Sequence, residues 1–170
     1  MSGDTQLRII TALVEHKPMA LYRVSNMIGR KSFNVESITV APAEVPGLAR
    51  MTFTMLSDHE RFDQVLKNLA SLIDVRSIEP LDARNATVRE LALVKFSIDH
   101  SKRRTEIMNL IETFHASIVD LSEDTLTVEI SGDSDKVKAF VSLARNVGLK
   151  KVTRTGTVAL ARRLMNLSDE

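Results

Sequence analysis

A short stretch between a predicted strand and a predicted helix carries the residues best suited to binding chemistry. It reads Glu15-His16-Lys17-Pro18-Met19-Ala20-Leu21. The N–H groups in the first turn of a helix have no acceptor within the helix, so such a turn can bind a carboxylate. Farther along, Asn34 carries a side chain that both donates and accepts hydrogen bonds. If the turn faces Asn34 of a second copy of the chain, a small amino acid fits between the two subunits.

The other titratable residues do not form a catalytic or metal-binding set. The histidines are not at ligand spacing from one another or beside an evident nucleophile; they are His16, His59, His100 and His115. The phosphate-binding patterns G-x-x-x-x-G-K-[ST] and G-x-G-x-x-G are absent from the sequence. Two basic clusters, Lys102-Arg103-Arg104 and Arg162-Arg163, are typical of solvated helix faces, with contact to an acidic partner as the alternative. We expect no catalytic residue, no metal and no cofactor in this chain.

Composition excludes several classes of protein. The chain has 170 residues, which is enough for one domain or two small ones, and its net charge is +1. No strong overall field therefore attracts nucleic acid or an anionic membrane. The absence of cysteine excludes disulfides, thiolate nucleophiles and zinc–thiolate sites. The first residues do not resemble a signal peptide, and no apolar run approaches the ~20 residues of a membrane span. We expect a soluble, cytoplasmic protein that binds neither nucleic acid nor membrane.

The first half of the chain follows the order strand, helix, strand, strand, helix, strand. The predicted strands are residues 8–14, 33–42, 48–56 and 73–78, and the predicted helices are residues 18–31 and a helix that opens at Ser57. In 48–56, apolar residues alternate with Arg50, Thr52 and Thr54, so one face is core and the other is wet or covered by another subunit. This order predicts a ferredoxin-like domain, with two helices on one face of a four-stranded antiparallel sheet.

Three local features refine this prediction. Residues 33–42 are apolar enough that an exposed edge would need a cover, so we expect the strand to pair with its symmetry mate in a dimer. Ser57 and Glu60 form a capping box in which Ser57 accepts a hydrogen bond from the N–H of Glu60. Four methionines are expected to fill the core rather than to line a binding surface; they are Met19, Met27, Met51 and Met55.

The second half of the chain repeats the same plan. The predicted elements are strands 91–98, 117–121, 125–131 and 149–154, a helix capped by Ser101, and a helix over residues 133–145. The sequence therefore predicts an α+β chain of two ferredoxin-like βαββαβ domains, residues 1–79 and 90–170, joined by a polar linker at 80–89. The tail from Gly156 fits a short strand or a helix. A unit of this size buries only about 60% of its unfolded surface, so each half is expected to pack on the other or on a second chain.

One long stretch resembles a known family. EHKPMALYRVSNMIGRKSFNVESITVAP, followed by LARMTF, is similar to the first domain of the small regulatory subunit of acetohydroxyacid (acetolactate) synthase. The resemblance is close over residues 8–78 and continues through LALVKF, ASIVDLSEDTLTVEISGDSDKVKAF and VTRTGTVALAR. It implies an ACT domain that dimerises and binds a branched-chain amino acid at the dimer interface, followed by a second ferredoxin-like domain. It also implies activation of a separate large subunit, which holds thiamine diphosphate, Mg²⁺ and FAD, and feedback inhibition, usually by valine.

The resemblance also assigns candidate effector-binding residues, and here the sequence departs from the family. The family turn reads Glu-Asn, two variable residues, then Gly-Ala-Leu, whereas this chain has His16 in place of Asn and Met19 in place of Gly. Ser32 replaces another family Gly, while Asn34 is kept. The candidate set is His16, Met19, Ala20, Leu21, Asn34 and Val35. Because a Met side chain fills space that Gly leaves open, and Pro18 lacks an N–H, we expect weak or lost valine sensitivity.

The sequence analysis therefore favours a non-catalytic regulatory subunit of acetolactate synthase. It would form a homodimer through its ACT domain, bind the catalytic large subunit and bind a branched-chain amino acid weakly if at all. The alternative is a stand-alone ACT-type amino-acid sensor for another enzyme or regulator. An independent enzyme is disfavoured because no set of carboxylate, histidine and nucleophile supports one.

Overall fold

The fold is described from a computed structural model that covers residues 5–30, 33–82, 84–98 and 101–162. Its helices are α1 (Pro18–Arg30), α2 (His59–Ala70), α3 (Ser101–Phe114) and α4 (Ser134–Ala144), with a 3₁₀ turn, η1 (Arg145–Val147). Its strands are β1 (Gln6–Glu15), β2 (Val35–Pro42), β3 (Leu48–Ser57), β4 (Val75–Leu81), β5 (Ala86–Ser97), β6 (Ser117–Leu121), β7 (Thr125–Gly132), β8 (Leu149–Arg154) and β9 (Val158–Ala161). The chain divides into two compact units, residues 1–88 with 157–170, and residues 89–156.

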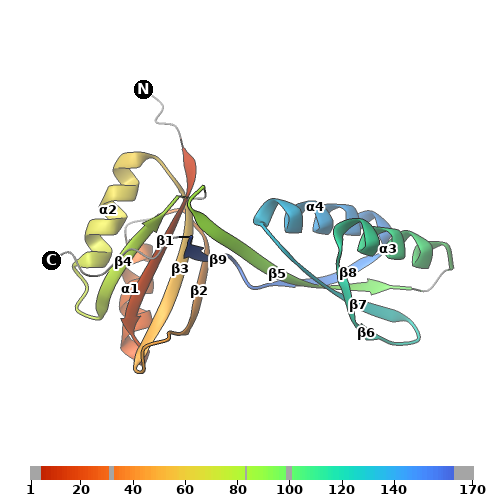
Figure 1. Cartoon of the computed structure of the whole chain (residues 1–170), viewed down its shortest axis with the longest axis horizontal. Helices are drawn as coiled ribbons and strands as arrows, with labels where there is room; N and C mark the ends of the chain where they lie inside the picture. The colour runs from red at the N-terminus through yellow and green to blue at the C-terminus, as the bar shows by residue number, and fades with distance from the viewer. Residues whose placement is uncertain (1–4, 31–32, 83, 99–100, 163–170) are drawn as a thin grey trace. The chain divides into compact units, whose positions relative to one another are not determined.

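The first unit has the predicted βαββαβ order. Its antiparallel sheet runs β2-β3-β1-β4, and α1 and α2 cover one face of it (Figure 1). The core between helices and sheet is aliphatic, with Phe53 and Phe62 as its aromatic members among the buried residues described. Met51 and Met55 are buried as predicted, but Met19 is 53% exposed, so the expectation that it fills the core is wrong.

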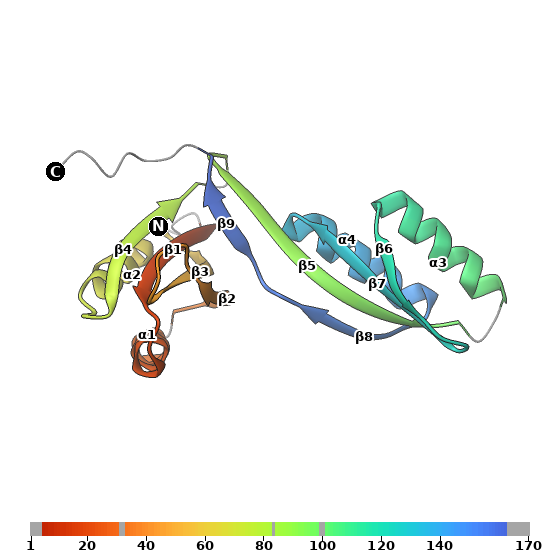
Figure 2. The same ribbon diagram turned by 60° about the horizontal axis from the view of Figure 1, so that its bottom comes forward.

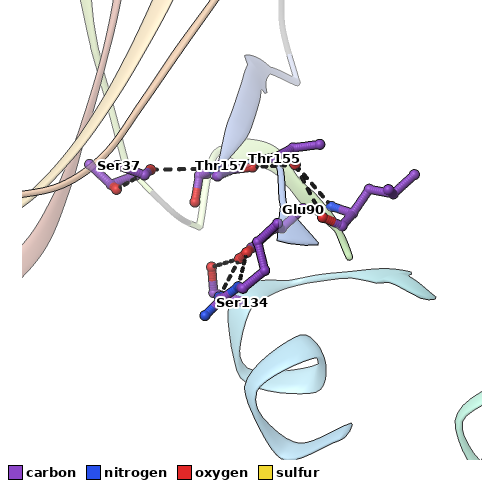
Figure 3. A network of polar contacts seen from close by, with 9 residues as sticks. Ser37, Glu90, Ser134, Thr155 and Thr157 are labelled. Carbon is purple, nitrogen blue, oxygen red and sulfur yellow. Dashed lines mark hydrogen bonds and ion pairs between the residues drawn. The ribbon is translucent and has the colours of Figure 1, made fainter. Parts of the chain in front are cut away.

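The second face of this sheet is covered by the end of the same chain. Thr52 and Thr54 on β3 are buried although they face away from the helices. Across this face, the N–H of Thr157 donates to Ser37 Oγ at 3.3 Å, and the Thr157 carbonyl accepts from Thr39 Oγ1 at 2.9 Å (Figure 3). Beyond Thr157, β9 lies along β1 and β4 and pairs with β5 (Figure 2). The described part of the tail is thus a strand, and it is grouped with the first unit, which differs from the expected second-domain range of 90–170.

The second unit repeats the ferredoxin-like arrangement that the sequence predicts. Its strands run β6-β7-β5-β8, and α3 and α4 cover one face of the sheet (Figure 1). Two edge-to-face ring pairs, Phe96 with Phe140 and Phe114 with Phe140, stabilise the core beneath the helices. The outer strand β6 is exposed at all five residues. The α+β prediction of two ferredoxin-like domains is therefore confirmed.

A buried ion pair lies within the second unit. Glu90 on β5 is only 3% exposed and accepts hydrogen bonds from Arg154 Nη2 on β8 and from Ser134 Oγ at the start of α4, both at 2.9 Å (Figure 3). Burial by itself raises the pKa of Glu90, but the hydrogen bonds from Arg154 and Ser134 and the charge of Arg154 outweigh it, so the pKa is lowered. The ionised carboxylate therefore holds the edge strand β8 and the start of α4 to β5.

Several local predictions are corrected. The cap of α2 is Asp58, whose side chain accepts from the N–H of Arg61 at 2.8 Å, and not Ser57, which belongs to β3. The expected linker at 80–89 is largely strand, because β4 continues to Leu81 and β5 begins at Ala86. Ser101, expected as the cap of α3, is instead its first helical residue, and the two residues before it lie outside the described residues.

Candidate functional site

The turn between β1 and α1 forms a small hollow in the first unit. Its volume is about 260 Å³, and it lies where the end of β1, the first turn of α1 and the middle strands of the sheet meet. The lining residues are Val14, Glu15, His16, Lys17, Pro18, Leu21, Val40, Ala49 and Met51. Of the six candidate residues, the hollow therefore brings together His16 and Leu21. Its floor is apolar and its rim is polar, which is the usual composition of a small-ligand site.

Most of the backbone donors in the turn are already occupied. The N–H of His16 donates to the carbonyl of Gly47 at 2.9 Å, and that of Lys17 donates to the carbonyl of Glu15 at 2.8 Å. Ala20 donates to Lys17, while Pro18 has no N–H. Among the residues described, the turn keeps one N–H without an acceptor, that of Met19. The helix start therefore offers fewer free backbone N–H groups than the sequence suggested.

The candidate side chains on α1 point in different directions. Ala20 is buried at 1% exposure, whereas Met19 and Leu21 are exposed at 53% and 45%. Met19 is not among the residues that line the hollow, so within a single chain its side chain does not fill the space below the turn. Its exposed side chain is instead available to a second chain or to a ligand that lies between chains.

Asn34 and Val35 lie at the other end of the sheet in the same chain. The carbonyl of Asn34 accepts from the N–H of Leu56 at 3.1 Å, and Val35 pairs with Met55 near the end of β3. The hollow, by contrast, lies near Ala49, where β3 begins. The length of β2 between them corresponds to about 25 Å. One chain therefore does not bring Asn34 to the turn, and Ser32 lies outside the described residues.

Charged residues fix the shape of the turn. Glu15 pairs with Lys17 at 2.6 Å and also with Arg76 of β4. The hydrogen bond from Lys17, with further contributions from the charges of Lys17 and Arg76, lowers the pKa of Glu15. On the far side, Arg23 Nη1 of α1 bonds to the buried carboxylate of Asp74 at 2.9 Å. These ion pairs link the turn to β4, and the second turn of α1 to the residue that precedes β4.

Two contributors to the hollow were missed from the sequence. Val40 on β2 lines it, and the carbonyl of Gly47 takes the N–H of His16. Gly47 has a φ of 81°, which favours glycine, and the Pro46-Gly47 pair was a recognisable turn signal. The pairing of this turn with the β1–α1 turn depends on strand order, which spacing alone does not reveal.

Neither a metal cluster nor a membrane-spanning helix is found in the described part of the chain. No group of three or more His, Cys, Asp or Glu there is arranged to hold a metal ion. None of the helices described is both long and apolar enough to cross a bilayer. His59 Nδ1 approaches Asp63 at 3.2 Å on the surface of α2, and His100 lies outside the described residues.

Comparison with known proteins identifies the family. Residues 10–77 match the family model described as AHAS small subunit-like ACT domain, and residues 89–163 match that described as small subunit of acetolactate synthase. A probable acetolactate synthase small subunit of Methanothermobacter thermautotrophicus is 44% identical over 162 residues, 95% of each chain. The small subunit of Bacillus subtilis is 38% identical over 91% of this chain and 90% of that protein. A crystal structure of the Thermotoga maritima small subunit has a TM-score of 0.86 and 34% identity, covering 94% of this chain and 99% of that one. The chain therefore belongs to the family of acetolactate synthase small subunits, the regulatory subunits of that enzyme.

Proposed function

We propose that this chain assembles with a separate catalytic subunit of acetolactate synthase, raises its activity and has no turnover of its own. The observation that carries the proposal is the match to small subunits over 95% of the chain. On this view thiamine diphosphate, Mg²⁺ and FAD are held by the catalytic subunit, and none of them by this chain.

The first unit is proposed to form a homodimer through β2. This strand is at the edge of the sheet, and its Ile38 and Val40 side chains are 38% and 43% exposed although they pair with core residues of β3. An apolar edge strand with free backbone groups readily pairs with another copy of itself. A two-fold axis near Ile38 would place two β2 strands antiparallel and cover these side chains.

The same antiparallel pairing would complete the effector site. It brings the start of β2 in one chain, with Asn34 and Val35, to the end of β2 in the other, beside the hollow at the β1–α1 turn. The amide of Asn34 then supplies the donor and acceptor that the turn lacks. A branched-chain amino acid is the proposed ligand, because the floor formed by Val14, Val40 and Met51 is apolar.

Valine sensitivity is proposed to be weak. An α-carboxylate needs donors, and the turn offers one N–H without an acceptor, that of Met19, among the residues described. The imidazole of His16 replaces an amide that accepts and donates at once. Each missing hydrogen bond to a charged ligand group weakens binding by roughly tenfold or more, so two such losses place valine affinity about two decades or more below that of a complete site.

Co-elution with the catalytic subunit tests the assembly. The chain and a candidate catalytic large subunit are purified separately, mixed and analysed by size exclusion with light scattering. The account expects one complex that contains both chains, and acetolactate formation from pyruvate only in fractions that contain the large subunit. The stand-alone amino-acid sensor predicts no complex at micromolar concentrations. Acetolactate formed by this chain alone would contradict both readings.

A further inference from the structure

Two buried polar atoms in the first unit have no hydrogen-bond partner. Among the residues described, the unsatisfied buried side-chain atoms are Nε of Arg8 and Oγ of Ser57. An unsatisfied buried donor typically costs the fold more than a kcal/mol, and most such groups in native proteins have a partner. The Nε of Arg8 is the more demanding of the two, because it belongs to a charged group, and hydrogen bonds to charged groups are worth more than those between neutral groups.

These atoms lie together on the helix-covered face of the sheet. Arg8 pairs with Met55 and Gln6 pairs with Ser57, so Arg8 and Ser57 are diagonal neighbours on β1 and β3. Met55 is fully buried in the core beneath the helices. Ser57 is two residues farther along the same strand, so its side chain points to the same side. The Arg8 guanidinium stacks over the ring of Phe62 in α2, with its carbon 5.4 Å from the ring centroid.

A cavity of about 590 Å³ opens beside the Arg8 side chain. Its lining is formed by the start of β1, the end of β4 and the turn that follows; the residues are Gln6, Leu7, Arg8, Phe62, Pro80, Leu81, Asp82 and Arg84. This volume suits a small molecule, and the lining is more polar than apolar, with Gln6, Asp82 and two arginines beside the leucines, proline and phenylalanine.

The one carboxylate in this lining is already engaged. Asp82 accepts from Arg84 Nη2 at 2.7 Å, from Arg84 Nε at 3.1 Å and from the Arg84 backbone N–H at 2.9 Å. The hydrogen bonds from Arg84 lower the pKa of Asp82 to about 2, so this pair is close to neutral as a unit. Arg8 forms no ion pair within the described part of the chain. Its charge contributes to the lowered pKa of Asp82, but the hydrogen bonds of that carboxylate come from Arg84, so the Arg8 guanidinium lines the cavity without a carboxylate bound to it.

We propose that this cavity binds a small oxyanion, a carboxylate or a phosphate, through the guanidinium of Arg8. A guanidinium fork matches the geometry of both anions. The site is distinct from the candidate effector site, because Arg8 is at the start of β1 and the β1–α1 turn is at its end, about 23 Å away along the strand. The inference does not depend on the proposed function.

Side-chain NMR of the full chain tests this inference directly. The Nε–Hε signal of Arg8 is followed while sodium phosphate or sodium propionate is added at constant ionic strength, with sodium chloride as the reference titration. We expect a saturable shift with phosphate, propionate or both, at a dissociation constant in the range of about 1–10 mM or below. Which probe saturates identifies the source of the anion. No saturable shift with either anion would overturn the proposal.

Matched variants separate this site from general surface charge. Arg8→Lys keeps the charge but removes the fork, and should weaken binding at least tenfold, followed by the amide signals of Phe62 and Leu81. Arg61→Gln is the matched control: it removes one positive charge from the exposed side of the first turn of α2 and should change affinity less than twofold. Equal weakening by both variants would overturn the proposal. Residues 1–4 are outside the described residues, so the variant Asp4→Asn tests whether the carboxylate of Asp4 binds Arg8. If Asp4→Asn shifts the Arg8 signal in the absence of added anion, the chain itself supplies the anion and the proposal is overturned.

Discussion

Replacement of Ile38 by lysine should separate the dimer. Ile38 is 38% exposed on the outer strand of the first sheet, and its pairing with Phe53 shows that it points to the helix-covered side. In the proposed dimer this exposed third of the side chain is covered by the partner. Loss of that burial is worth about 1 kcal/mol, since full burial of such a side chain is worth about 1.5–3 kcal/mol.

A lysine at this position adds a second cost. In an isologous interface each substitution occurs twice, and two ammonium groups near the two-fold axis repel each other while losing part of their hydration. A further ~1 kcal/mol per copy gives about 4 kcal/mol per dimer, or roughly a thousandfold weaker association at 1.4 kcal/mol per decade.

The assay is sedimentation or light scattering over a range of concentrations. Ile118→Lys is the matched control, because Ile118 is 42% exposed on β6, the outer strand of the other sheet. Ile38→Lys should shift the dimer–monomer midpoint by about three decades, and Ile118→Lys should leave it unchanged. A wild-type monomer at micromolar concentration, or equal effects of the two lysines, would refute the reasoning.

Three further predictions concern the buried ion pair, the C-terminal strand and the effector site. Glu90→Gln should lower the free energy of unfolding by about 1–3 kcal/mol at pH 7. Because the folded pKa of Glu90 is lowered, the carboxylate stabilises the protein fully above its unfolded pKa of about 4.3 and loses this effect as pH falls through the folded pKa. Urea unfolding should therefore show a smaller difference in unfolding free energy between wild type and variant at pH 3 than at pH 7. A difference that does not change with pH would contradict this prediction. Ser37→Ala should cost about 1 kcal/mol and speed hydrogen exchange at the Thr157 amide, and unchanged exchange there would count against the contact. His16→Asn combined with Met19→Gly should tighten valine binding at least tenfold by calorimetry, whereas a wild-type chain that already binds valine at tens of micromolar would show that the substitutions are tolerated.

The fold could be predicted from the sequence because its local signals agree with one another. Alternation in residues 48–56 and the helical spacing of apolar residues in 18–31 point to the same two-layer arrangement, and a recurrence of the plan in the second half supports it. Strand ends were less accurate, since polar residues such as Thr87 and Arg89 continue β5 through a segment that was read as a linker. The ladders of β5 with β7 and β8 begin at Glu90 and Ala92, so the polar start of the strand lies outside the paired core of that sheet.

The candidate site could be predicted only in part. The turn at residues 15–21 was found because a strand-to-helix junction has a recognisable sequence, but the acceptor for His16 comes from Gly47, which only the fold brings near. The role of Thr157 was missed for a similar reason. The backbone of Thr157 is held by the side chains of Ser37 and Thr39. Hydroxyl side chains on a strand can face solvent, a second chain or another part of the same chain, so the sequence alone does not identify their partner.

Activation of the catalytic subunit is the most direct test of the regulatory role. A fixed amount of the large subunit is titrated with this chain, and the rate of acetolactate formation from pyruvate is followed until it no longer changes. The account predicts a saturable increase of several-fold that reaches its plateau at a fixed ratio of the two chains, while the chain without the large subunit gives no product. A rate that stays the same at saturating amounts of this chain would contradict it.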